Sequence, residues 1–242
     1  MWGRMRGRAL SPGVRELPSP NQDDRPAGAA IDTLVLHYTG MRSGAEAIAR
    51  LRDPAARVSS HYVVEEDGAV LRLVPEARRA WHAGISHWRG MAALNDRSIG
   101  IEIVNPGHDW GYRPFPALQM AAVCDLCLEI LARHPIPPIN VVAHSDIAPD
   151  RKADPGELFD WEGLAANGVG LWPAAADAPA PAGAPAGASA AALLSAIGYR
   201  TDLPLPVLLA AFQRHWRPAR VDGVADAETL ARLAGLVRML GA

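Results

Sequence analysis

Residues 144–156, His-Ser-Asp-Ile-Ala-Pro-Asp-Arg-Lys-Ala-Asp-Pro-Gly, place an imidazole, an amine and a carboxylate in one short segment. The amine belongs to Lys152, the only lysine of the chain; every other basic side chain in the Lys+Arg count of 24 is arginine. A compact, rotatable ammonium differs chemically from the planar fork of arginine. Lys152 lies between His144 and Asp154, two residues that can ligate a metal ion. The segment therefore indicates metal-assisted chemistry with a nearby cation.

A second histidine, His37, ends the apolar run of residues 32–38, and His144 follows a similar run at residues 139–143. Short apolar runs of this kind are typical of interior strands. In an α/β sheet, functional side chains gather where strands end. Two imidazoles and the carboxylate of Asp154 provide three ligands and leave a fourth position open, as a catalytic zinc requires. We therefore predict a Zn²⁺ site.

An acidic residue, Glu102, interrupts the apolar run of residues 98–104. Burying an unpaired carboxylate is expensive, so this side chain needs partners or a function. Beside an activated water it would suit a general base. The alternative is a glutamate that faces the surface or forms a salt bridge.

The elements that would position these residues belong to an α/β fold. Residues 60–65 and 70–74 flank a Glu-Asp-Gly-Ala turn, which is a strong hairpin signal. Apolar residues recur at helical spacing over about 43–52 and 117–133. We expect a central mixed β-sheet flanked by helices.

An Ala/Pro/Gly-rich segment separates this domain from three short helices expected at 191–197, 204–215 and 226–240, with Asp226 as N-cap of the last. We therefore expect a small all-α three-helix domain after the α/β domain. The predicted boundaries are an N-terminal extension at 1–30, a catalytic domain at 31–172, a linker at 173–190 and a helical domain at 191–242.

Composition excludes some classes of function. The formal net charge of −2 argues against general attraction to nucleic acid or anionic lipid, and no apolar run reaches the roughly 20 residues of a membrane span. The basic N-terminus lacks a following apolar segment, so we expect a cytoplasmic protein, with the cell envelope as the alternative. Cys124 and Cys127 fall on helical spacing and are expected to be buried, inert thiols.

Five strings, in this order over about residues 31–161, resemble the zinc-dependent N-acetylmuramoyl-L-alanine amidases, the type 2 amidases related to peptidoglycan recognition proteins. Most of them contain a residue discussed above. The strings are Leu36–Gly40, Ser60–Val64, Ala80–Gly84, Ser98–Asn105 and His144–Gly156.

The resemblance implies that His37, His144 and Asp154 hold zinc, that Glu102 activates water and that Lys152 stabilises developing negative charge. Some relatives instead use a tyrosine before the hairpin, where this chain has Ser-Ser-His at 59–61, so the variant with glutamate and lysine fits better. Recognition proteins without activity have usually lost a zinc ligand, and all three are present here. This favours an enzyme; a non-catalytic peptidoglycan receptor is the alternative.

Other positions receive secondary roles. Four residues are predicted to bind substrate: Tyr38, Trp81, His82 and Asn105. His61 is predicted to contact the metal-binding residues without binding the metal itself. The remaining histidines are expected in loops or on the surface and are assigned no function: His87, His108, His134 and His215.

The reaction implied is hydrolysis of the amide bond that joins N-acetylmuramic acid, or its 1,6-anhydro form, to L-alanine; the partners are peptidoglycan fragments or murein. A zinc hydrolase of this fold that acts on another amide is a weaker alternative. Phe212-Gln213-Arg214 and Asp222-Gly223-x-x-Asp226 resemble a small peptidoglycan-binding module, with a helical cap docked on the catalytic domain as the alternative. Recycling of small muropeptides and remodelling of polymeric murein both stay open, and the sequence does not indicate an oligomeric state.

Overall fold

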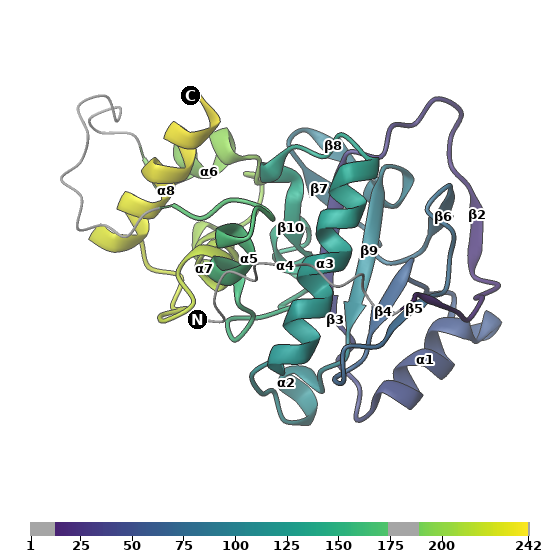
Figure 1. Cartoon of the computed structure of the whole chain (residues 1–242). Coiled ribbons are helices and arrows are strands. Elements are labelled where there is room, and N and C mark those ends of the chain that lie inside the picture. Colours follow the sequence, from purple (N-terminus) through teal and green to yellow (C-terminus); the bar gives the residue numbers. More distant parts are fainter. Residues whose placement is uncertain (1–12, 174–188, 242) are drawn as a thin grey trace.

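The computed structural model describes residues 13–173 and 189–241, and a six-stranded sheet organises its larger part (Figure 1). The order across the sheet is β1-β5-β4-β9-β3-β10. Its strands are β1 (Arg15–Glu16), β3 (Thr33–Tyr38), β4 (Tyr62–Val64), β5 (Val70–Arg72), β9 (Ser98–Ile103) and β10 (Val141–Ala143).

The sheet is mixed, as predicted. Strands β4, β9, β3 and β10 are parallel to one another, while β5 pairs with β4 in the opposite direction through the expected hairpin. Parallel strands end at the same edge of a sheet. The carboxyl ends of β3, β9 and β10 therefore lie side by side.

Alternation along the strands gives the sheet two different faces. Leu34 and Leu36 of β3 pack with Val123 and Ile130 of α3 (Ala117–Arg133), which crosses one face in Figure 1. The intervening residues of β3 face the other way, and Val35 joins a different hydrophobic cluster. His37 is two residues further along β3 and so lies on the face opposite α3.

Helix α1 (Gly44–Arg52) covers part of that second face. Its N-cap, Ser43, accepts a hydrogen bond from the backbone of Glu46, and its buried Leu51 packs with Val63 and Leu71 of the sheet. Both long helices that flank the sheet, α1 and α3, thus form where the apolar spacing predicts them.

Several short elements were not predicted from the sequence. They are β2 (Gln22–Asp24) paired with β6 (Arg78–Ala80), β7 (His87–Trp88) paired with β8 (Met91–Ala92), and the helices α2 (Gly107–Trp110), α4 (His144–Ile147) and α5 (Trp161–Ala166). β1 and β2 come from the predicted N-terminal extension and pair with β5 and β6. Residues 144–147, expected in a loop, form a helical turn because the Asp146 carboxylate accepts a hydrogen bond from Ala143 N–H.

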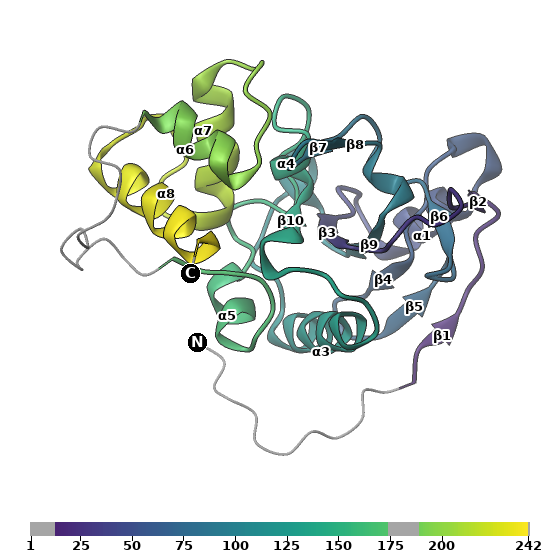
Figure 2. The same cartoon turned by 90° about the horizontal axis from the view of Figure 1, so that it is seen from above.

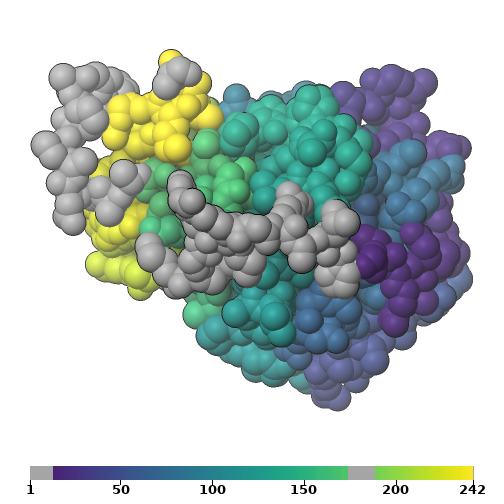
Figure 3. Space-filling model, in the orientation of Figure 1, coloured from purple at the N-terminus to yellow at the C-terminus, as the bar shows by residue number. Residues whose placement is uncertain are grey.

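Three helices follow, as predicted: α6 (Ala190–Ile197), α7 (Leu205–Trp216) and α8 (Ala227–Leu240). Asp226 caps α8 by accepting a hydrogen bond from Thr229 N–H. Leu194 and Phe212 share one hydrophobic cluster with Val35 and Val142 of the sheet. The C-terminal helices therefore pack directly on the part of the chain that contains the sheet (Figures 2 and 3). Most of the predicted linker, residues 174–188, lies outside the described residues.

Within the described ranges, no helix has the length and apolarity that crossing a membrane would require. Cys124 and Cys127 are buried on α3, as expected, and neither is part of a disulfide. Burial raises the pKa of the Cys127 thiol well above its ordinary value, which is consistent with an inert side chain.

Candidate active site

Three predicted ligands converge at the carboxyl ends of the parallel strands. Nδ1 of His37 lies 2.9 Å from Nδ1 of His144 and 3.0 Å from Oδ2 of Asp154. The same carboxylate oxygen lies 3.0 Å from Nδ1 of His144. All three side chains are buried. The strand ends thus bring residues that are 107 and 117 positions apart in sequence into one cluster.

The hydrogen bonds behind the cluster indicate which ring nitrogens carry protons. Nε2 of His144 faces the carbonyl oxygen of Ala83 at 3.3 Å, and a carbonyl can only accept, so this nitrogen is protonated. Nε2 of His37 faces Nδ1 of His82 at 3.1 Å, and we assign the proton to His37. Both Nδ1 atoms then present lone pairs to each other and to Asp154. Such an arrangement repels unless a cation lies among the three atoms.

The donor set suits zinc. Imidazole nitrogens and a carboxylate oxygen are ordinary zinc ligands with bonds of about 2.0–2.2 Å, so ligand atoms around one tetrahedral ion lie about 3.3–3.6 Å apart. The three atoms here are 2.9–3.0 Å apart, a few tenths of an ångström closer. Burial, together with the neighbouring His144, lowers the pKa of His37 to about 4, which keeps this imidazole neutral at pH 7. Burial opposes ionisation of Asp154, but the two imidazoles outweigh it and hold the pKa of that carboxyl below its ordinary range.

Glu102 lies beside the ligand cluster. It is the register partner of His37 on the adjacent parallel strand, so the two side chains project from the same face of the sheet. Its Oε2 is buried and has no hydrogen-bond partner among the described residues. Burial and the nearby Asp154 raise the pKa of Glu102 well above its ordinary range, while Lys152 partly opposes this shift. A raised pKa makes this carboxylate a stronger proton acceptor than an ordinary glutamate, as a general base requires.

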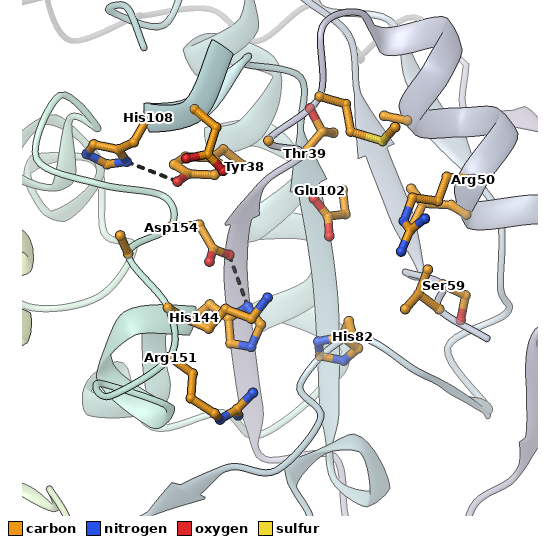
Figure 4. A pocket seen from close by; sticks show the side chains of 18 of the residues that line it. Tyr38, Thr39, Arg50, Ser59, His82, Glu102, His108, His144, Arg151 and Asp154 are labelled. Atoms are coloured by element: carbon orange, nitrogen blue, oxygen red, sulfur yellow. Dashed lines mark hydrogen bonds and ion pairs between the residues drawn. The ribbon is translucent and has the colours of Figure 1, made fainter. Parts of the chain in front are cut away.

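A cavity of about 470 Å³ opens onto these residues (Figure 4). Glu102, His144, Lys152 and Asp154 all line it. Figure 4 shows the carboxylates of Glu102 and Asp154 facing the hollow from neighbouring strands and loops. The predicted acid–base group, the predicted cation and two of the three predicted metal ligands are therefore accessible to one bound molecule, while His37 lies beneath them and does not line the cavity.

His82 occupies a position behind His37. Its Nδ1 faces His37, and its Nε2 lies 3.1 Å from Oγ of Ser98. Its ring lies against Gly100, where an added Cβ would come within 2.5 Å of it. Both ring nitrogens are occupied, so His82 holds the orientation of His37 although it also borders the cavity. Metal-ligating histidines commonly have such a partner.

His61 is one layer further away. Its Nδ1 accepts a hydrogen bond from Gly100 N–H, and its ring packs edge-on against His82 with centroids 5.6 Å apart. Burial and the adjacent Arg25 lower the pKa of His61 to about 3, so the ring stays neutral. His61 therefore packs against His82, and its contacts in the described part of the chain do not include the three predicted metal ligands.

Of the other predicted substrate-binding residues, two line the cavity and one does not. Tyr38 and Trp81 line the cavity, and Tyr38 OH lies 3.0 Å from Nδ1 of His108. Asn105 is fully buried and does not line the cavity. Its amide donates to the carbonyl of Arg113 and accepts from Gly107 N–H, so it shapes the loop after β9. The position of Asn105 thus speaks against contact with substrate.

Sequence analysis missed one buried histidine near the site. His215 was expected in a loop or on the surface, but it lies in α7 and is 2% exposed. Its Nδ1 donates to Asp146, two residues after the ligand His144. Helical spacing alone could have suggested burial, because His215 lies three residues after Phe212 on the apolar stripe of α7.

Comparison with known proteins identifies the chain. Residues 27–157, more than half of it, match the family described as N-acetylmuramoyl-L-alanine amidase. The chain belongs to this family. The N-acetylmuramoyl-L-alanine amidase AmiD of Escherichia coli (strain K12) is 40% identical over 234 residues, which cover 87% of this chain and 84% of that protein. The 1,6-anhydro-N-acetylmuramyl-L-alanine amidase AmpD of the same strain is 36% identical over 167 residues, 62% of this chain and 88% of AmpD.

Solved amidase structures share the whole fold. E. coli AmiD in complex with anhydro-N-acetylmuramic acid-L-Ala-D-γ-Glu-L-Lys matches with a TM-score of 0.77 and 40% identity, covering 90% of this chain and 93% of AmiD. AmpDh3 of Pseudomonas aeruginosa in complex with anhydromuramic pentapeptide matches with a TM-score of 0.78 and 36% identity, covering 89% of this chain and 94% of AmpDh3. Family membership and these relatives confirm the prediction of an enzyme and speak against a non-catalytic receptor.

Proposed function

We propose that this amidase hydrolyses the bond between the lactyl carbonyl of N-acetylmuramic acid, or of its 1,6-anhydro form, and the amine of L-alanine. The observation that carries the proposal is the convergence of His37, His144 and Asp154 beside Glu102 at one cavity; the buried Oε2 of Glu102 has no hydrogen-bond partner among the described residues. Relatives whose names specify this bond are 40% identical over 234 residues and 36% identical over 167 residues.

His37, His144 and Asp154 would hold Zn²⁺, which when bound polarises a carbonyl and lowers the pKa of water. Glu102 accepts a proton from the attacking water and later delivers it to the leaving amine of L-alanine, since an amine leaves readily only when protonated. Its raised pKa suits both transfers. The ammonium of Lys152 then stabilises the negative charge that develops on the carbonyl oxygen.

The form of the substrate is tested by mass spectrometry of the products from zinc-loaded protein. Three substrates are compared: a disaccharide-tetrapeptide, its 1,6-anhydro form and intact sacculi. The proposal predicts free stem peptide with an unblocked L-alanine from at least one of them. If zinc is bound and none of the three is cleaved at this bond, the proposal is wrong.

The same comparison bears on the partners and the compartment. Cleavage of the small anhydro compound alone would support a recycling enzyme inside the cell that acts on peptidoglycan fragments. Cleavage of sacculi would support an enzyme of the cell envelope that acts on polymeric murein.

A further inference from the structure

A buried polar contact joins the C-terminal helices to the catalytic part. The Asp146 carboxylate accepts a hydrogen bond from the hydroxyl of Tyr199 at 2.5 Å and another from Nδ1–H of His215 at 2.7 Å. The three residues are 1–3% exposed. A buried carboxylate is costly unless donors compensate it, and two of its side-chain donors here come from beyond residue 189.

Asp146 is also part of the element that carries a metal ligand. It lies on α4 together with His144, and its Oδ2 accepts a hydrogen bond from the backbone N–H of Ala143, the residue just before that ligand. On the other side of α4, Ser145 N–H donates to the backbone carbonyl of Asp154 at 3.0 Å. The turn bearing His144 is therefore tied both to a second ligand and to the C-terminal helices.

The orientation of His215 is itself fixed. Its ring stacks on Trp216 with centroids 3.6 Å apart and on Trp161 of α5 with centroids 3.7 Å apart. Stacking on two indoles holds the ring in one plane, and within that plane the hydrogen bond to Asp146 favours the orientation in which Nδ1–H faces the carboxylate. Helices α4 and α7 pack together, and Figure 2 shows α4 on the side of the sheet that α6 and α7 approach.

We infer that Tyr199 and His215 are positioning residues of the metal site: through Asp146 they hold α4 so that Nδ1 of His144 faces His37 and Asp154. The inference rests on the proposed metal-dependent function. It assigns the C-terminal helices a role in metal binding that does not depend on contact with peptidoglycan, and so develops the alternative of a docked cap.

The test compares full-length variants by their zinc affinity, measured in competition with a chromophoric chelator, and by the visible spectrum of the Co²⁺-loaded protein. Tyr199→Phe removes one donor to Asp146 and keeps the ring. His215→Leu removes the other donor, whereas His215→Asn keeps a donor near the position of Nδ1. Tyr62→Phe is the matched control, since Tyr62 is also a buried tyrosine whose hydroxyl donates to a carboxylate, that of Glu76, at 2.7 Å.

Loss of a partner behind a metal ligand typically weakens metal binding by about 10–100-fold. We expect losses in this range for Tyr199→Phe and His215→Leu, with altered Co²⁺ bands, a smaller loss for His215→Asn, and affinity within about twofold of wild type for Tyr62→Phe. The spectrum separates the proposed role from a general loss of stability, because it reports the ligand geometry of the folded protein.

Wild-type zinc affinity in folded Tyr199→Phe would overturn the inference, and this mild variant decides the matter if His215→Leu does not fold. An equal loss in Tyr62→Phe would also overturn it, because the effect would then be general destabilisation. A wild-type protein that binds no zinc would instead contradict the proposed function itself.

Discussion

At the scale of single residues, the chemistry depends on side chains whose types sequence analysis could identify. His37 and His144 stand at the ends of apolar runs, Asp154 follows ten residues after His144, and Glu102 stands out as an acid within an apolar run. The role of Asn105 could not be identified in this way, because nothing in the sequence shows that its amide folds back onto its own loop.

Glu102→Gln tests the acid–base role. The amide keeps the size of the side chain but cannot take up the proton of the attacking water. We expect kcat to fall by about 10²–10⁴-fold with zinc content unchanged. Steady-state kinetics together with metal analysis checks this, and a zinc-loaded variant with near wild-type kcat would exclude Glu102 as the general base.

Lys152→Arg tests why the only lysine of the chain stands at the cavity. Arginine keeps the charge but presents it on a longer, planar group, so it would be misplaced relative to the carbonyl oxygen. We expect kcat to fall by about tenfold or more, with a smaller change in KM. Near-full turnover with zinc bound would show that only the charge matters at this position.

At the scale of elements, sequence patterns predicted the long helices and the central strands but missed short pieces. β1, β2 and α4 have two to four residues each, too few to show a periodicity. α4 forms because the Asp146 carboxylate accepts a hydrogen bond from the Ala143 N–H. The nearby prolines and glycine favour the prediction of a loop, so this local contact was not expected. This turn is the one that carries His144.

Glu76 connects the end of α3 to the sheet and makes stability depend on pH. Burial alone would raise its pKa, but hydrogen bonds from Arg133, Tyr62 and His134 outweigh burial and lower the pKa of Glu76 from 4.5 to about 2. A lowered folded-state pKa stabilises the protein above the unfolded pKa. This contribution, about 3 kcal/mol at most, is complete above pH 4.5 and disappears as the pH falls toward 2.

Glu76→Gln should therefore reduce the free energy of unfolding more at pH 7 than at pH 3. Urea denaturation of the variant and the wild type at both pH values measures this difference, and taking the difference at each pH cancels the other acid-sensitive groups. An equal loss at both pH values would show that the ionised form of Glu76 does not contribute to stability.

At the scale of the whole molecule, the C-terminal helices and the catalytic part share one hydrophobic cluster and a buried polar contact. The helices themselves could be predicted from their spacing and from the Asp226 cap. The contact between these helices and the sheet could not be predicted in the same way. Asp146 and His215 are 69 positions apart, and nothing in the sequence around either residue indicates that the two side chains meet. Contacts of this kind arise only from the folded arrangement.

Metal removal should affect the stability of the entire chain. Three buried ligands, from β3, α4 and the loop after α4, share one site. Zinc that binds only the folded state therefore stabilises it by about 2.7 kcal/mol at a concentration 100 times Kd. We expect a chelator to lower the Tm of the wild type and to change that of His144→Ala little. Thermal unfolding with zinc and with chelator checks this; an unchanged wild-type Tm would argue against a zinc site here.

The central claim is hydrolysis of the bond between the muramic acid lactyl group and L-alanine, and one isotope experiment tests it most directly. Zinc-loaded protein is given a 1,6-anhydro-muropeptide in H₂¹⁸O, and both products are analysed by mass spectrometry. Water attacks the lactyl carbonyl and the nitrogen leaves with the peptide. One ¹⁸O atom should therefore appear in the lactyl carboxylate of the sugar product and none in the released peptide. Label in the peptide, or a peptide that does not begin with L-alanine, would contradict the account.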